Sequence, residues 1–359
     1  TPSGSLTTGV TILKNMGTVT FDGFTVNNFS ESGIIQGMSQ REGTKAIIQN
    51  NIVTPAGTYL RNGIQVTGDG SEVKNNTVNG ARLTEEWGST GISVTNGSNI
   101  LVKDNIVNGG TNGVDAGIAV LNYDVSLVTG VTLEGNIIHD ATAAVTIQGG
   151  PNASGIQTIV DKVTIKGNNF DESETGIDIA YVNLTGSNVV EKNNFSGNKT
   201  YIAIWQEGYA PYNYPGAKVT GSINATKNWY GSITGPDVAR FYDDNTTDAF
   251  TFLESVYAPW CGDAECTFLN PKTVTTVNEL NDAIGSAPDG ASVYVTGGTY
   301  GQSGAINLNN DNLTIILAAN TVIQNSSPCF IINADNTRIL AEPGAKCIPT
   351  NNSNGIDVA

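Results

Sequence analysis

Several residue types are scarce in this 359-residue chain, and each shortage excludes a class of protein. There is one His and only four Cys, so a zinc site built from these ligands is disfavoured. Only 14% of the residues are charged, and acidic residues outnumber basic ones by 33 to 17, which gives a formal net charge of -16. Such a surface repels nucleic acids and anionic lipids. No run of 18 apolar residues occurs, so the sequence predicts no membrane-spanning helix.

Turn-forming and β-branched residues are abundant. Gly and Asn each occur 42 times. Strong helix formers are few by comparison, and this balance is typical of an all-β protein with many tight turns.

The four cysteines fall into two local pairs, Cys261 with Cys266 and Cys329 with Cys347. Because no His lies nearby, two disulfides are preferred over zinc binding, and disulfides imply an oxidising compartment. The eighteen-residue spacing of the second pair is close to one short coil of a solenoid. It predicts that Cys329 and Cys347 occupy the same corner of adjacent coils. Twelve Asn-x-Ser/Thr sequons are candidate glycosylation sites: Asn28, Asn75, Asn96, Asn152, Asn183, Asn194, Asn198, Asn224, Asn245, Asn312, Asn325 and Asn351.

A short phrase recurs along the chain: two polar residues, usually ending in Asn, followed by apolar residues. In successive copies the second polar residue is Asn51, Asn76, Asn105, Asn136, Asn169, Asn194 and Asn228. A strand of three to five residues cannot bury its apolar face alone, but stacked copies can. We therefore expect these Asn residues to form a ladder between coils rather than a catalytic site.

A second phrase, Gly followed by apolar-x-apolar, alternates with the first. It begins at Gly63, Gly91, Gly117, Gly176 and Gly355. Its strand period predicts that Ile64, Ile92, Ile118 and Ile177 point inward in one stacked aliphatic column.

These repeats resemble those of the pectin-lyase-like right-handed parallel β-helix proteins, especially repeat-rich surface and periplasmic members. Residues 228–236 and 257–260 are similar to the phrases that close the last coil in that family. The resemblance implies an all-β right-handed parallel β-helix. It implies no single function, because the fold includes lyases, hydrolases, epimerases, adhesins and structural proteins.

The order of the parts is inverted relative to that resemblance. Residues 1–250 are similar to the middle and C-terminal coils of a β-helix, and 251–272 to a closing segment or linker with the first Cys pair. A capping box of Thr276 and Glu279 then predicts a short capping helix near 276–286, so that 273–359 resembles the first coils of another β-helix. Both ends of the chain are expected to lie in mid-coil. We expect another copy to continue them, or, as the alternative, a circularly permuted or cropped monomer.

Motifs for catalysis are missing. None of the five Arg (Arg41, Arg61, Arg82, Arg240 and Arg338) lies in a lyase-like phrase, and His139 is expected to be structural or solvent-facing. Asp115, Asp140 and Asp178 lie on successive coils, but their registers differ. Asp243, Asp244 and Asp248 are candidate Ca²⁺ ligands, with a solvated acidic loop as the alternative. Trp205, Tyr209, Tyr212 and Tyr214 are candidates for stacking on sugar rings, or they pack a long loop.

The sequence therefore favours an extracellular or cell-surface structural β-solenoid that assembles end to end with copies of itself, without a cofactor or a catalytic residue. The alternatives are a carbohydrate-active enzyme, such as a polysaccharide lyase or glycosidase, and a glycan-binding adhesin. A groove lined by converging carboxylates and aromatic residues would favour these alternatives.

Overall fold

A computed structural model describes most of the chain. The described residues are 7–13, 16–37, 43–57, 61–80, 88–110, 113–123, 127–150, 157–205, 219–233, 235–243, 259–266, 269, 271–288, 290–326 and 328–350, together with the backbone of 356–358. They form two compact units. Unit 1 comprises Thr1–Gly231 and Pro236–Ala258, and unit 2 comprises Ser232–Gly235 and Pro259–Ala359.

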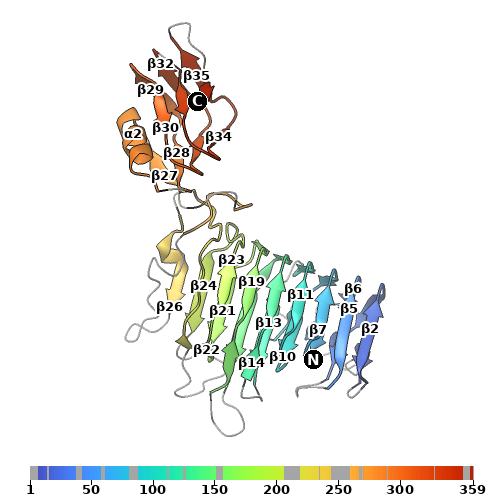
Figure 1. Ribbon diagram of the computed structural model, residues 1–359. Coiled ribbons are helices and arrows are strands. Elements are labelled where there is room, and N and C mark those ends of the chain that lie inside the picture. The colour runs from blue at the N-terminus through green and yellow to red at the C-terminus, as the bar shows by residue number, and fades with distance from the viewer. Residues whose placement is uncertain are drawn as a thin grey trace. The chain divides into compact units, whose positions relative to one another are not determined.

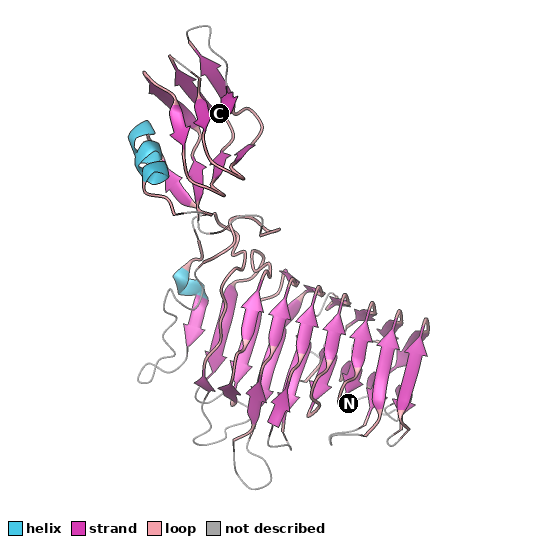
Figure 2. Cartoon of the chain, viewed as in Figure 1, coloured by secondary structure: helices cyan, strands magenta, loops and turns pink. Residues whose placement is uncertain are grey.

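Unit 1 is a solenoid of parallel strands, in which each coil gives one strand to each of several sheets (Figures 1 and 2). The first sheet contains β1 (Thr8–Ile12), β4 (Ser32–Gln36), β7 (Asn62–Val66), β10 (Thr90–Thr95), β13 (Val114–Asn122), β17 (Ala141–Gly149), β21 (Thr175–Ala180), β24 (Thr200–Trp205) and β26 (Phe241–Asp243). The second contains β2 (Thr18–Asp22), β5 (Lys45–Gln49), β8 (Glu72–Lys74), β11 (Leu101–Lys103), β15 (Thr132–Glu134), β19 (Thr164–Lys166) and β23 (Val189–Glu191).

Two smaller sheets complete unit 1. The third sheet contains β3 (Thr25–Phe29), β6 (Ile52–Pro55), β9 (Thr77–Asn79), β12 (Ile106–Asn108), β16 (Ile137–His139) and β20 (Asn169–Asp171). The fourth contains β14 (Leu127–Thr129), β18 (Ile159–Asp161), β22 (Asn183–Thr185) and β25 (Thr220–Gly221). A 3-10 helix, η1 (Val238–Arg240), precedes β26. The predicted all-β parallel solenoid is confirmed.

The predicted aliphatic column is also confirmed. Ile92 of β10 lies in register between Ile64 of β7 and Ile118 of β13, and all three side chains are fully buried. The column continues through Val145 of β17 to Ile177 of β21. Each fully buried aliphatic side chain contributes about 1.5–3 kcal/mol, so the stack is a major part of the core.

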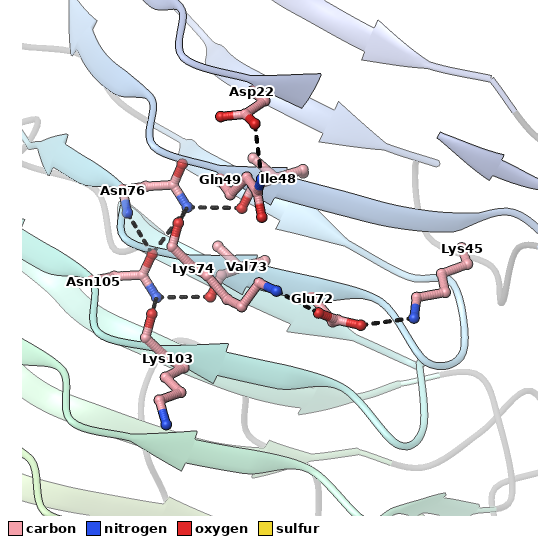
Figure 3. A network of polar contacts seen from close by, with 10 residues as sticks. All are labelled: Asp22, Lys45, Ile48, Gln49, Glu72, Val73, Lys74, Asn76, Lys103 and Asn105. Atoms are coloured by element: carbon pink, nitrogen blue, oxygen red, sulfur yellow. Dashed lines mark hydrogen bonds and ion pairs between the residues drawn. The ribbon is translucent and has the colours of Figure 1, made fainter. Parts of the chain in front are cut away.

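An asparagine ladder joins the coils at one corner. The amide nitrogen of each ladder residue donates to the side-chain oxygen of the next, 2.9–3.0 Å away, and also to a backbone carbonyl, as Figure 3 shows for Asn76 and Asn105. The members are Asn51, Asn76, Asn105, Asn136, Asn168, Asn193 and Asn228.

The expected ladder is thus confirmed, but its predicted register was wrong in two copies. Asn168 and Asn193 are the ladder residues, whereas Asn169 and Asn194 lie one position later. The steps that differ from expectation are 32 residues from Asn136 to Asn168 and 35 from Asn193 to Asn228. The physical reason is that the buried Phe170 and Phe195 stand two positions after the ladder residue, as Val53 and Val78 do.

Side chains on the outer face of the second sheet form ion pairs between coils. Glu72 bonds Lys45 of the preceding coil and Lys74 of its own strand, both at 2.7 Å (Figure 3). The Lys45 ammonium, followed by that of Lys74, lowers the pKa of Glu72. These pairs are partly exposed, so each adds little to stability.

Aromatic side chains fill the interior of the last coils of unit 1. Phe195 contacts Phe170, Tyr201 and Tyr230, with ring centroids 5.0–6.2 Å apart. Tyr230 and Tyr201 also pack against Phe241. Tyr230 belongs to the phrase that was expected to close the last coil.

Unit 2 is a second parallel solenoid with three sheets. The first contains β27 (Lys272–Val274), β28 (Ser292–Val295), β31 (Thr314–Leu317) and β34 (Arg338–Ala341). The others contain β29 (Gly298–Gln302), β32 (Thr321–Asn325) and β35 (Lys346–Pro349), and β30 (Ile306–Leu308), β33 (Phe330–Ile332) and β36 (Ile356–Val358).

The predicted helix is confirmed as α2 (Val277–Gly285), which packs against β27, β28 and β29. Thr276 and Glu279 form the expected capping box, and Leu280, Ala283 and Ile284 are buried. The boundaries predicted at residues 250 and 272 stay a prediction, because 244–258 lie outside the described residues.

Both expected disulfides are present, but the predicted position of one was wrong. Cys261 pairs with Cys266, and Cys329 pairs with Cys347 with the Cα atoms 6.0 Å apart. Cys347 lies in register with Ile323 of β32, not with Cys329, which precedes β33. One coil here is longer than eighteen residues, so the bridge links two different positions around the coil rather than one corner.

Candidate functional site

The outer face of the first sheet carries a groove that crosses the strands. Its volume is about 530 Å³. The lining residues are Arg61, Asn62, Gly88, Thr90, Asp115, Ala116, Ala119, Leu121, Tyr123, Thr142, Ala143, Thr146, Gln148, Glu174, Thr175, Asp178, Ala180 and Trp205. A smaller hollow of about 260 Å³ shares Arg61, Asn62, Leu121 and Tyr123, and extends the groove towards β4.

The strand register explains why this face is hollow. The middle residue of each apolar-x-apolar phrase points outward, and these residues stack across the strands. Around the centre of the groove this column runs from Ala119 through Thr146 to Asp178. A neighbouring column places Ala116 beside Ala143. Small side chains thus form the floor.

Two aromatic side chains, Trp205 and Tyr242, lie at one end of the groove. Trp205 is the last residue of β24, in register with Ala180 of β21. Its ring lies 5.0 Å from that of Tyr242 in β26. An aromatic pair beside a polar floor is suited to stacking on a sugar ring.

Asp178 is the distinctive polar group of the floor. It lies between the buried Ile177 and Ile179 on β21. Its Oδ1 atom is buried without a hydrogen-bond partner among the residues that the structure describes. Burial raises the pKa of Asp178 to about 7, and a hydrogen bond from the Trp205 side chain opposes this rise.

The other two acids of the groove have different surroundings. Asp115 is buried, and its Oδ2 accepts hydrogen bonds from the backbone of Gly88 and Ser89 and from the Ser89 hydroxyl, at 2.7–3.0 Å. Glu174 is exposed and pairs with Lys199 at 2.9 Å. Asp140 lies at a left-handed turn position after β16 and does not line the groove. The three aspartates of successive coils therefore do not share one register.

The remaining predicted candidates lie elsewhere. His139 lies on the third sheet, its Nδ1 3.1 Å from Asp171 Oδ2. Tyr209, Tyr212, Tyr214, Asp244 and Asp248 fall outside the described residues, so their candidate roles stay predictions. Within the described part of the chain, no group of three or more His, Cys, Asp or Glu residues could hold a metal ion.

The sequons differ in accessibility. Asn96, Asn198 and Asn325 are buried, so these side chains are not open to glycan attachment in the folded chain. Asn28, Asn75, Asn224 and Asn312 are exposed. Asn183 and Asn194 are half-buried, and Asn152, Asn245 and Asn351 are outside the described residues.

A second hollow of about 520 Å³ lies in unit 2, next to α2. Its lining consists of amides, small residues and Ile284, without a charged or aromatic side chain among the described residues. It therefore offers less chemistry than the groove of unit 1.

A family model described as the right handed beta helix region matches residues 8–222. The chain belongs to this right-handed β-helix family. The match covers the strands that form the groove of the β-helix, and it confirms the predicted handedness. No curated protein matches the sequence.

Two solved structures of the PL6 family alginate lyase AlyGC, one of them an arginine-to-alanine mutant, are similar to the β-helix chain. Each is 12% identical to it with a TM-score of 0.17. The matches cover 96% and 98% of this chain, and 73% and 75% of the lyase chains. The helices in the described part of the β-helix chain are all too short or too polar to cross a membrane.

Asp178 is expected to make stability depend on pH. In the folded chain the pKa of the Asp178 carboxyl group is about 7, above its usual value of 3.8. Between pH 3.8 and pH 7 the folded state therefore binds more protons than the unfolded state. The contribution of the protonated Asp178 carboxyl group to folding stability is fully present below about pH 4 and is lost as the pH rises through 7. Chemical denaturation at several pH values should therefore show Asp178→Asn gaining stability relative to wild type as pH increases. Parallel pH profiles for the two proteins would contradict the assignment.

Proposed function

We propose that this protein is an extracellular glycan-binding β-helix whose groove holds a polysaccharide chain across the first sheet. The observation that carries the proposal is the groove itself, whose lining includes Trp205 and Tyr123 together with Asp178 and Gln148. Aromatic rings stack on the apolar faces of sugars, while carboxylates and amides hydrogen-bond their hydroxyl groups. The two disulfides indicate an oxidising environment, which supports a location outside the cell.

The surroundings of the acids favour binding over hydrolysis. Glycosidases use two carboxyl groups about 5–10 Å apart, one of which acts as an acid. Asp115 and Asp178 lie two strands and four register positions apart, which puts their Cα atoms roughly 16 Å apart. Glu174 aligns with Asp115 two strands away, roughly 10 Å, but Asp115 Oδ2 is bonded to Gly88 and Ser89, and Glu174 is paired with Lys199.

Trp205→Ala is expected to abolish retention of the protein on polysaccharide affinity gels, because it removes the stacking surface at the end of the groove. Loss of one such ring corresponds to about a tenfold or greater change in affinity. Tyr294→Ala in unit 2 is the matched control and should bind normally. If wild-type protein is retained by no member of a broad panel of neutral, basic and acidic polysaccharides, the proposed function is wrong.

End-to-end assembly is a second candidate, favoured by the surface of the first coil. Leu13, Met16 and Phe24 there are 65%, 61% and 55% exposed. The strands β1, β2 and β3 of this coil are each the last in their sheet, and so are β34, β35 and β36 in unit 2. Edge strands with nearby apolar side chains recruit other chains. Pairing of the last coil of one copy with the first coil of another would be heterologous and would give an open filament.

Electron microscopy and light scattering test this assembly. We expect filaments at high protein concentration, and we expect the double variant Leu13→Lys, Phe24→Lys to remain monomeric. The control variant Ile106→Lys, Leu127→Lys changes two apolar residues that are exposed on the sides of the solenoid, and it should still assemble. A wild-type protein that stays monomeric at every concentration rules out the assembly.

A further inference from the structure

The groove carries an excess of negative charge. Its lining contains three carboxylates, Asp115, Glu174 and Asp178, and one cation, Arg61. Arg61 pairs with Glu31 at 3.1 Å, and Glu174 pairs with Lys199 at 2.9 Å. With these partners included, four carboxyl groups accompany two cations, which gives a formal charge of -2 when Asp178 is ionised and -1 when it is protonated. A polyanionic ligand would add like charges to this site.

Asp178 lines the groove together with Trp205. Its neighbours in register are Thr146 of β17 and Ala203 of β24, neither of which is charged. The Trp205 side chain donates one hydrogen bond to the carboxyl group. The Oδ1 atom is buried without a partner among the described residues, whereas the residue as a whole is half-buried and lines the groove. A largely desolvated carboxylate is costly, so a ligand that places a positive charge beside this carboxyl group is favoured.

We infer that the groove is built for a polysaccharide that carries free amino groups, with the Asp178 carboxyl group facing a ligand ammonium beside the Trp205 ring. This inference rests on the proposed glycan-binding function and names its ligand class. An ammonium group places a positive charge beside the Asp178 carboxyl group and balances the negative charge of the groove. It also makes a cation–π contact when it lies over an indole ring. A polyuronate, in contrast, places its own carboxylates next to Asp178 and Glu174.

Proton release provides a signature that a purely structural role for Asp178 would not give. Burial raises the pKa of this carboxyl to about 7, so it is mostly protonated at pH 6. A bound ammonium favours the ionised carboxylate and lowers its pKa, so binding at pH 6 should release a proton from Asp178. Isothermal titration calorimetry in buffers of different ionisation enthalpy measures this release. The Glu174–Lys199 pair and Asp115 also lie in the groove, so the Asp178→Asn variant is needed to assign the proton.

The decisive experiment compares three oligosaccharides of equal length: a glucosamine hexamer, an N-acetylglucosamine hexamer and a galacturonate hexamer. Wild-type protein should bind the glucosamine hexamer about tenfold or more tightly than the acetylated one, and the galacturonate most weakly. Asp178→Asn should weaken glucosamine binding by about tenfold and remove the proton release. It should weaken binding of the acetylated hexamer much less than binding of the glucosamine hexamer.

Asp171→Asn is the matched control, because it removes the same charge from the same coil on the third sheet, outside the groove. It should change none of these affinities. Thermal unfolding of both variants verifies that they fold. If the acetylated or acidic hexamer binds as tightly as the glucosamine hexamer, or if Asp178→Asn changes nothing while Trp205→Ala abolishes binding, the amino-sugar inference is wrong and glycan binding stands. If no sugar binds to wild type, the proposed function fails as well.

Discussion

Replacing Ile92 with aspartate should lower the free energy of unfolding of unit 1 by about 5 kcal/mol, enough to unfold many domains. Ile92 is fully buried between Ile64 and Ile118, so the new carboxylate would lie in an aliphatic column without a partner. The cost combines loss of the buried side chain with desolvation of the charge. Urea denaturation followed by circular dichroism measures it.

Ile106→Asp is the control for this prediction. Ile106 lies on the outer face of β12 and is 37% exposed, so the same substitution there should change stability by no more than about 1 kcal/mol. A fully stable Ile92→Asp variant would mean that the strand register of the first sheet is shifted by one residue, since such a shift exchanges the inner and outer faces.

Replacing Asn105 with alanine should cost about 3–5 kcal/mol. Its side chain donates to the carbonyls of Val73 and Lys103 and to Asn136 Oδ1, and accepts from the backbone and side-chain nitrogens of Asn76. Each of these five bonds contributes on the order of 1 kcal/mol, and the buried partners left behind add a desolvation penalty.

Asn108→Ala provides the comparison within the same coil. The side chain of Asn108 donates to Asn79 Oδ1 on the outer face of the third sheet, and it is partly exposed. Its removal should cost about 1 kcal/mol or less. Equal losses for Asn105→Ala and Asn108→Ala in chemical denaturation would show that the inner ladder adds nothing beyond an ordinary surface hydrogen bond.

The repeated positions of the chain could be predicted from the sequence because the same physical demand recurs in every coil. The same inner position of successive coils is filled by Ile64, Ile92 and Ile118. The hydrogen-bonding groups at one corner are paired in the same way by Asn51, Asn76 and Asn105. The register was missed at Asn168 and Asn193, where the outward position after the ladder residue is itself an asparagine. It could have been found from the buried aromatic two positions later.

The groove could not be predicted in the same way, because its floor uses positions that do not repeat. The middle residue of the apolar-x-apolar phrase is Ser93, Ala119 or Asp178 in different coils. A charged residue at this outward position was the available signal for Asp178. Among the described residues its Oδ1 has no partner, and its neighbours in register, Thr146 and Ala203, belong to other coils of the chain. The Cys329 position was missed because the spacing of the pair was taken as the length of one coil.

Constant register between coils has a consequence for how such a protein can evolve. The ladder residues keep their contacts although the intervening segments vary from 25 to 35 residues. A duplicated coil would therefore insert without disturbing its neighbours, and would lengthen the groove by one strand spacing of about 4.8 Å. Under the proposed glycan-binding function, the length of oligosaccharide that fits the groove would be separable from recognition at Asp178, so that duplication changes the first and point substitution changes the second.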